Sequence, residues 1–241
     1  MSRDTVTSEK RMRCSIALLL MMLPGLAASQ QQSHHTLKVE PQVLAPGYSA
    51  LEFPAPAVGS YALPILGKAK DGDLRDSSGA PTTLHALYNN KTIVLSFIYT
   101  TCPDVNGCPL ATFVLGQVQR RLSADERLNK NVRMISVSFD PVNDSPAVMA
   151  NYGKTFRRAE IDWRFLTAES EEKLAPILNN YDQAVIRDRD ADGQPVGAMS
   201  HILRVYLIDP QKNIRNIYSP SYLHPDTLFA DIRTIADGHM P

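Results

Sequence analysis

Two cysteines, Cys102 and Cys108, are the residues of this chain best placed to do chemistry. They lie in the stretch Thr-Cys-Pro-Asp-Val-Asn-Gly-Cys-Pro at residues 101–109. Two thiols at this separation can form a structural disulfide, act as a redox dithiol or bind a metal ion through sulfur. A disulfide here would close a short ring that Pro103 and Pro109 already stiffen, so it would remove little entropy from the unfolded chain. The spacing therefore favours a reactive or metal-binding pair over a structural bond.

The elements on either side of this loop should place the thiols at the edge of a sheet. Residues 92–99 form a nearly continuous apolar and β-branched run, which is typical of a central strand covered on both faces. Residues 109–122 carry apolar side chains at helical spacing, so Cys108 should lie at a helix N-terminus. Ligands bind beyond the carboxyl ends of strands in open α/β sheets, and free amides at a helix N-terminus favour a thiolate. We therefore expect both cysteines to be reactive rather than packed in the core.

From residue 57 to residue 241 the chain reads as one domain in which strands alternate with helices. This order predicts an α/β fold with a central sheet and helices on both faces. The expected strands are 92–99, 132–139, 162–166, 200–209 and 214–218, with a hairpin around 71–79; the expected helices are a short one at 84–87, then 109–122, one that opens at Ser145-Pro146, 169–180 and 225–236.

The N-terminal residues have the pattern of an export signal. Basic residues at positions 10–13 precede an apolar run at 16–23, which is too short to cross a bilayer, and small residues follow it. We expect residues 1–29 to be a signal peptide, cleaved together with Cys14 or kept as a membrane anchor. Residues 30–56 should form a flexible linker. The protein would then lie in the periplasm or at the outer face of the inner membrane, where disulfides can form.

Composition narrows the remaining function classes. The chain has 25 basic and 25 acidic residues, so its zero net charge gives no electrostatic reason to expect a nucleic acid partner. Hydrophobic residues at 44% and charged residues at 21% match an ordinary globular protein. We find no Ser-His-Asp arrangement, phosphate-binding loop or paired-carboxylate pattern. The function should therefore be sought at the cysteines.

Three stretches in the same order resemble motifs of the Sco/SenC family. Residues 101–104 with 108–112 resemble its cysteine loop, and residues 136–146 resemble its strand, Asp-Pro turn and helix start. Residues 200–210 place His201 where this family has its histidine ligand.

The resemblance implies a thioredoxin-like fold with a central mixed β-sheet flanked by helices. It also implies one copper ion, as Cu(I) or Cu(II), bound by Cys102, Cys108 and His201, and a role in assembling the copper centre of cytochrome c oxidase. The expected partner is the copper-bearing oxidase subunit or another copper or thiol protein, with membrane association through the N-terminal segment. Two thiolates and one imidazole form a soft ligand set that suits Cu(I), whereas zinc usually takes a fourth ligand, and no further Cys or His is obvious.

The cysteine spacing departs from the family pattern. The family has three residues between its cysteines and this chain has five, with Asn106-Gly107 as the apparent insertion. The longer loop could let both sulfurs converge on one metal ion, or it could have kept only dithiol chemistry. The alternative function is therefore a thiol-disulfide oxidoreductase that uses Cys102 and Cys108 on cysteines of a partner protein. A peroxidase would also need an Arg beside the cysteine, and none can be placed.

Other polar residues near these motifs have simpler interpretations. Asp140 and Asp144 should serve the turn and the helix cap near Pro141 and Ser145, and Met199 should pack beside its strand. His34 and His35 should be exposed in the linker, whereas no partner can be named for His85, His224 and His239.

Overall fold

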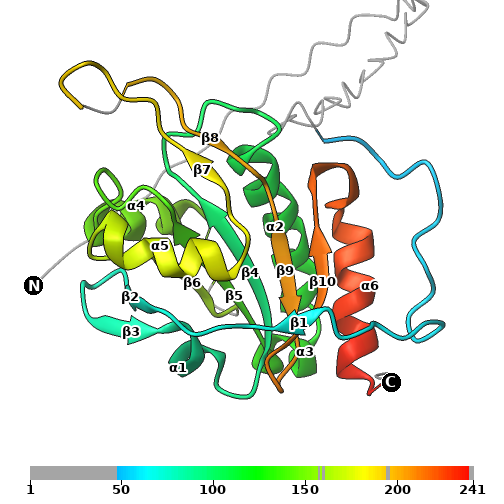
Figure 1. The fold of residues 1–241 in the computed structure, drawn as a ribbon. Coiled ribbons are helices and arrows are strands. Elements are labelled where there is room, and N and C mark those ends of the chain that lie inside the picture. The colour runs from blue at the N-terminus through cyan, green and yellow to red at the C-terminus, as the bar shows by residue number, and fades with distance from the viewer. Residues whose placement is uncertain (1–47, 157, 159–160, 194–195, 239–241) are drawn as a thin grey trace, which may run out of the picture. The chain divides into compact units, whose positions relative to one another are not determined.

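The computed structural model describes residues 48–156, 158, 161–193 and 196–238 (Figure 1). These residues belong to a compact unit that spans Gln42–Pro241. The predicted signal peptide and most of the predicted linker, including Cys14, His34 and His35, lie outside the described residues, as does His239. Within the described ranges, no helix is both long and apolar enough to cross a membrane.

The centre of the fold is a mixed sheet of six strands in the order β1-β10-β9-β4-β5-β6. Strands β4, β5 and β6 run parallel to one another, whereas β9 is antiparallel to β4, and β10 is antiparallel to both β9 and β1. Every residue of β4 and β5 is buried, as the apolar runs predict. The strands are β1 (Gly67–Lys68), β4 (Thr92–Ile98), β5 (Val132–Ser138), β6 (Trp163–Leu166), β9 (Val205–Ile208) and β10 (Asn213–Tyr218).

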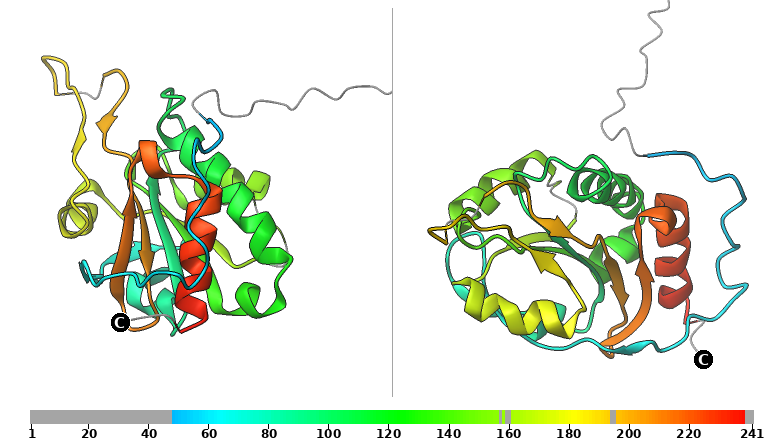
Figure 2. Two further views of the ribbon diagram at one scale, coloured as in Figure 1. Left: turned by 90° about the vertical axis from the view of Figure 1, so that its right-hand side faces the viewer. Right: turned by 45° about the horizontal axis from the view of Figure 1, so that its top comes forward.

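Helices cover both faces of this sheet, which confirms the predicted fold class. Helices α2, α4 and α6 lie over one face, and α5 lies over the other (Figure 2). Right-handed crossovers explain why α2 and α4 share a face, because β4, β5 and β6 are parallel and follow one another in the same direction across the sheet. The helices are α1 (Leu84–Tyr88), α2 (Cys108–Ser123), α3 (Glu126–Asn131), α4 (Pro146–Phe156), α5 (Glu171–Asn180) and α6 (Pro225–Ala236), with a 3-10 turn η1 (Pro220–Tyr222) before α6.

Local capping explains why several helices begin where they do. Ser145, predicted to cap α4, accepts a 3.4 Å hydrogen bond from the amide of Val148. His224 caps α6 by accepting a hydrogen bond from the amide of Asp226 at its Nδ1, and its Nε2 lies 3.0 Å from the hydroxyl of Tyr48. This histidine, for which the sequence suggests no partner, therefore has a structural role.

The prediction of one continuous strand at residues 200–209 is wrong, because this segment forms two short strands that belong to different sheets. The first part, β8 (Ser200–His201), pairs with β7 (Val185–Ile186) in a two-stranded ribbon in which Val185 lies opposite His201. The second part, β9, lies in the central sheet. Alternation of side chains predicts extended backbone but cannot show that the strand changes partner.

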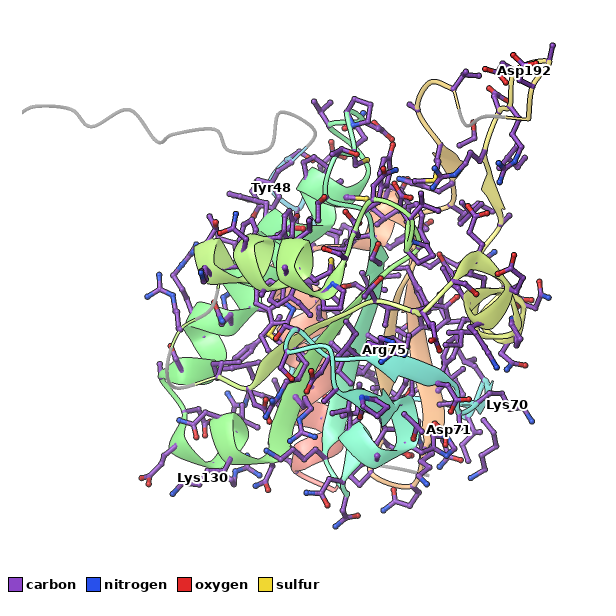
Figure 3. The ribbon with its side chains drawn as sticks, turned by 90° about the vertical axis from the view of Figure 1, so that its left-hand side faces the viewer. Tyr48, Lys70, Asp71, Arg75, Lys130 and Asp192 are labelled. Atoms are coloured by element: carbon purple, nitrogen blue, oxygen red, sulfur yellow. The ribbon has the colours of Figure 1, made fainter. Side chains whose placement is uncertain are left out.

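The β7–β8 ribbon stands at the edge of the sheet where β4 ends (Figure 1). Figure 3 shows Asp192, on the segment between β7 and β8, at the end of this projection farthest from the sheet. A second two-stranded sheet, β2 (Asp73–Arg75) with β3 (Pro81–Thr83), forms the hairpin predicted around residues 71–79.

Candidate metal centre

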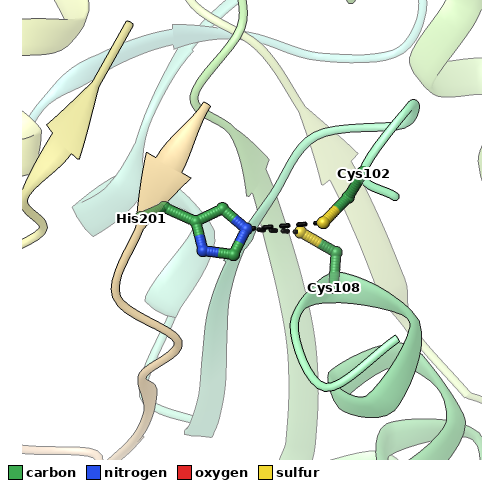
Figure 4. Close-up of side chains that lie close together, drawn as sticks. All are labelled: Cys102, Cys108 and His201. Carbon is green, nitrogen blue, oxygen red and sulfur yellow. Dashed lines mark hydrogen bonds between the residues drawn. The ribbon is translucent and has the colours of Figure 1, made fainter. Parts of the chain in front are cut away.

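Three side chains meet at the carboxyl end of β4 (Figure 4). The Nε2 atom of His201 lies 3.4 Å from Sγ of Cys102 and 3.5 Å from Sγ of Cys108. The three potential ligand atoms all lie within 4.8 Å of one another, and both cysteines are free thiols. The structure therefore brings together the three residues singled out from the sequence.

Strand direction explains how residues 99 positions apart in the chain come into contact. Because β9 is antiparallel to β4, the residues that precede β9 lie at the same edge of the sheet as the residues that follow β4. His201 precedes β9 and Cys102 follows β4. Had β9 been parallel to β4, the same histidine would lie at the opposite edge.

The cysteine loop is held by its own backbone and by one buried carboxylate. The amides of Asn106 and Gly107 donate to Oδ1 and to the carbonyl oxygen of Asp104, at 3.0 and 2.9 Å. At the start of the loop, Asp144 accepts hydrogen bonds from the amide and the hydroxyl of Thr100. Asp144 also accepts a 2.6 Å hydrogen bond from the hydroxyl of Ser138. Asp144 therefore links the cysteine loop to the end of β5. The sequence predicts only a turn or helix-cap role for this residue.

Asp140 anchors the histidine side of the site. Its buried carboxylate pairs with Arg187, which directly follows β7, and both side chains are largely excluded from solvent. Arg187 also lies 3.5 Å from a carboxylate oxygen of Glu171 on α5. Since β7 pairs with β8, this ion pair fastens the strand that carries His201 to the turn after β5. The sequence predicts Asp140 in a turn, but no neighbouring residue in the sequence indicates that it pairs with Arg187.

Aromatic rings orient the imidazole of His201. The rings of Tyr99 and Phe139 contact it edge to face, with centroids 5.6 and 5.0 Å away. Its Nδ1 atom is buried and has no hydrogen-bond partner among the described residues. Packing, rather than an acceptor at Nδ1, therefore sets the direction of Nε2 towards the sulfurs. Met199 is buried in the core, in keeping with the packing role predicted for it.

The two thiols are electrostatically different. A hydrogen bond from the Cys108 thiol, followed by those from His201 and from the amides of Cys108 and Asp104, lowers the pKa of Cys102 to about 4 against the cost of partial burial. The pKa of Cys108 is raised, because its thiol donates to Cys102 and because it is buried beside that charge. The hydrogen bond to Cys102 raises the pKa of His201.

The sequence predicts that the helix N-terminus favours a thiolate at Cys108. The structure instead favours the thiolate at Cys102. Cys108 is the first residue of α2, with Gly107 as the cap, and the residue is only 1% exposed. Its amide stabilises the partly exposed Cys102 thiolate, whereas at its own sulfur the same amide is outweighed by the hydrogen bond to Cys102 and by burial. The prediction that both cysteines avoid core packing is wrong for Cys108, which belongs to the buried core, whereas Cys102 is only partly buried and packs against that core.

The donor set fits a soft metal ion. Bonds of about 2.0 Å to nitrogen and 2.3 Å to sulfur, as zinc makes, allow one ion to contact atoms separated by 3.4 or 3.5 Å. Among the described residues, no fourth Cys, His, Asp or Glu joins this group. Two thiolates and one imidazole without a fourth ligand suit Cu(I) better than structural zinc.

The fold and this site define a class of protein. A mixed sheet flanked by helices, with one cysteine in the loop after a central strand and a second at the start of the next helix, is a thioredoxin-like domain, here with a histidine added from a neighbouring ribbon. The SCO1/SenC family model matches residues 70–237, and the chain belongs to this family.

Relatives of known structure or curated sequence agree with this assignment. The SCO1 protein homolog of Bacillus subtilis is 24% identical over 161 residues, which cover 66% of this chain and 78% of that protein. The copper-bound ScoI of Bradyrhizobium japonicum is 25% identical, with a TM-score of 0.56 over 69% of this chain and 98% of that one. Yeast Sco1 has a TM-score of 0.59 at 22% identity, over 70% of this chain and 98% of the yeast chain.

Proposed function

We propose that this protein is an exported copper-binding assembly factor that delivers copper to the copper centre of cytochrome c oxidase. The observation that carries the proposal is the convergence of Cys102, Cys108 and His201 at the edge of the sheet. Family membership and the copper-bound relative from Bradyrhizobium japonicum support copper as the ion. BsSco, a structural relative with a TM-score of 0.57, is described as a member of the Sco family of cytochrome c oxidase assembly proteins. Export is supported by the signal pattern of residues 1–29.

Each side chain contributes differently to copper binding. Cys102 is partly exposed and already a thiolate, so it offers the first anionic ligand to an arriving ion. Cys108 is buried and protonated, so its thiol must release a proton when it binds. His201 binds through Nε2 in its neutral form, with its proton on Nδ1. Copper binding should therefore release protons to solvent.

Transfer to an oxidase fragment tests the delivery role. The protein loaded with one equivalent of Cu(I) is mixed with the copper-free, soluble copper-bearing domain of the oxidase subunit. We expect copper to reach this fragment faster than from the same amount of copper–glutathione, with the copper content of the separated fragment measured by atomic absorption at successive times. Equal rates from the two donors would refute the assembly role while leaving copper binding intact.

A second candidate function, thiol-disulfide exchange, is favoured by the unequal thiols. The accessible Cys102 thiolate can attack a partner's disulfide to form a mixed disulfide and release one partner thiolate. Cys108 then loses its proton and attacks Cys102, which releases the second partner thiolate and leaves the Cys102–Cys108 disulfide. Two electrons pass from the cysteine pair to the partner.

The reduction potential of the cysteine pair tests this candidate. A catalytic couple should have a potential between about −270 and −120 mV, and a value below about −300 mV would indicate a resistant structural bond. His201→Ala separates the two functions, because it removes a metal ligand but neither sulfur. A variant that loses copper and keeps disulfide reductase activity would show that both chemistries exist.

A further inference from the structure

Gly107 is the point at which the lengthened cysteine loop meets the histidine. It is the cap residue of α2 and belongs to the Asn106-Gly107 pair that lengthens the loop relative to the family pattern. A Cβ atom at residue 107 would lie 3.0 Å from Cε1 of His201 and 3.0 Å from Oδ2 of Asp104. Ordinary van der Waals contacts of a Cβ atom begin at 3.4 Å. Any side chain at residue 107 would therefore need both of these neighbours to move by a few tenths of an ångström.

The two neighbours differ in how freely they can move. The imidazole of His201 lies against the rings of Tyr99 and Phe139. Asp104 is exposed, and among the described residues its carboxylate accepts only the hydrogen bond from the amide of Asn106 at Oδ1, so Oδ2 can turn away from a new Cβ atom more readily than the packed imidazole can. Because Cε1 is bonded to Nε2, a push on Cε1 displaces the atom that faces both sulfurs.

We propose that Gly107 is a positioning residue for His201, and that its missing side chain lets the five-residue spacer close against the imidazole so that Nε2 reaches both thiols. This role in copper binding rests on the proposed function. Its physical content, the contact between residue 107 and the imidazole, is present without metal. A loop with this spacing and any larger residue at 107 would hold the two sulfurs while turning the imidazole away from them.

The test compares Gly107→Ala with Gly116→Ala in the full chain. Gly116 lies within α2, where an added Cβ would meet no atom within 4 Å outside its own helix, so it is a matched control. Copper affinity is measured by competition with a chromophoric Cu(I) chelator. The side-chain NMR signals of His201 in the metal-free protein give a readout that does not depend on copper.

We expect Gly107→Ala to bind one copper ion with an affinity lower by about 10- to 100-fold, the usual effect of disturbing a residue that orients a metal ligand. The His201 signals should shift, and Gly116→Ala should match the wild type in both measurements. In a His201→Ala background, Gly107→Ala should have no further effect on affinity. Unchanged affinity and unchanged His201 signals in Gly107→Ala would overturn the inference.

The outcomes also separate this inference from the proposed function. If His201→Ala alone leaves copper affinity unchanged, the three-ligand site fails, whatever residue 107 does. If Gly107→Ala does not fold, the Gly107→Ala/His201→Ala double variant should fold, because the imidazole is gone and the exposed Asp104 carboxylate can turn away from the new Cβ. A double variant that also fails to fold would overturn the inference.

Discussion

Replacing either cysteine with serine should abolish copper retention through a desalting column, whereas the wild type should retain one copper per chain. The convergence of Cys102, Cys108 and His201 leaves only two ligands in each variant. Changing a residue that merely orients a ligand costs about 10- to 100-fold in affinity, so loss of a thiolate should cost more than about 100-fold. A serine hydroxyl does not replace the sulfur, because it stays neutral and is a hard donor that Cu(I) disfavours. Copper content by atomic absorption checks the result.

The histidine and a nearby methionine complete this series. His201→Ala should also lose copper, and its Cu(II) spectrum should change before the copper is lost. Met199→Leu is the matched control, because Met199 precedes His201 by two positions and is buried in the core. Copper retained with an unchanged spectrum in His201→Ala would remove the imidazole from the ligand set. Copper lost in Met199→Leu would add the thioether to it.

Cys102 should react with iodoacetamide at a nearly constant rate between about pH 5.5 and pH 8, whereas an ordinary thiol gains about tenfold per pH unit in this range. The folded structure lowers the pKa of Cys102 to about 4, chiefly through the hydrogen bond from Cys108. The thiolate therefore persists until the pH falls through that value. Because nucleophilicity falls with pKa, the rate advantage over an ordinary thiol at pH 5.5 should be only on the order of tenfold. Mass spectrometry of the labelled peptide measures the rate at Cys102 alone.

Two substitutions at residue 108 locate the cause of this lowered pKa. Cys108→Ala removes the hydrogen-bond donor, so the midpoint of the Cys102 pH profile should rise. Cys108→Ser keeps a donor, so its midpoint should stay low although this variant has lost a copper ligand. A wild-type midpoint near that of an ordinary thiol, about 8.5, would show that the two sulfurs do not share a proton in this way.

Local patterns of apolar residues are enough to predict the strands and helices that form the core. The apolar runs that form β4 and β5 and the helical spacing that forms α2 and α6 are examples, and all four lie within a few residues of their predicted bounds. The position of Cys102 in the loop after β4 and of Cys108 at the start of α2 follows from the same patterns. Only the resemblance to a family identifies His201, because a single histidine near a strand has no local signature of a ligand. The export segment remains a prediction.

Tertiary structure alone decided how these residues meet. The division of the predicted strand 200–209 and the antiparallel direction of β9 depend on which strands pair, and side-chain alternation is the same for either direction. The ion pair of Asp140 with Arg187 joins segments that are distant in sequence. The assignment of the thiolate to Cys102 rather than Cys108 likewise depends on burial and on the direction of one hydrogen bond. A sequence pattern indicates which face of each segment is buried. The chemistry of this site depends instead on distances between segments, and these exist only in the folded chain.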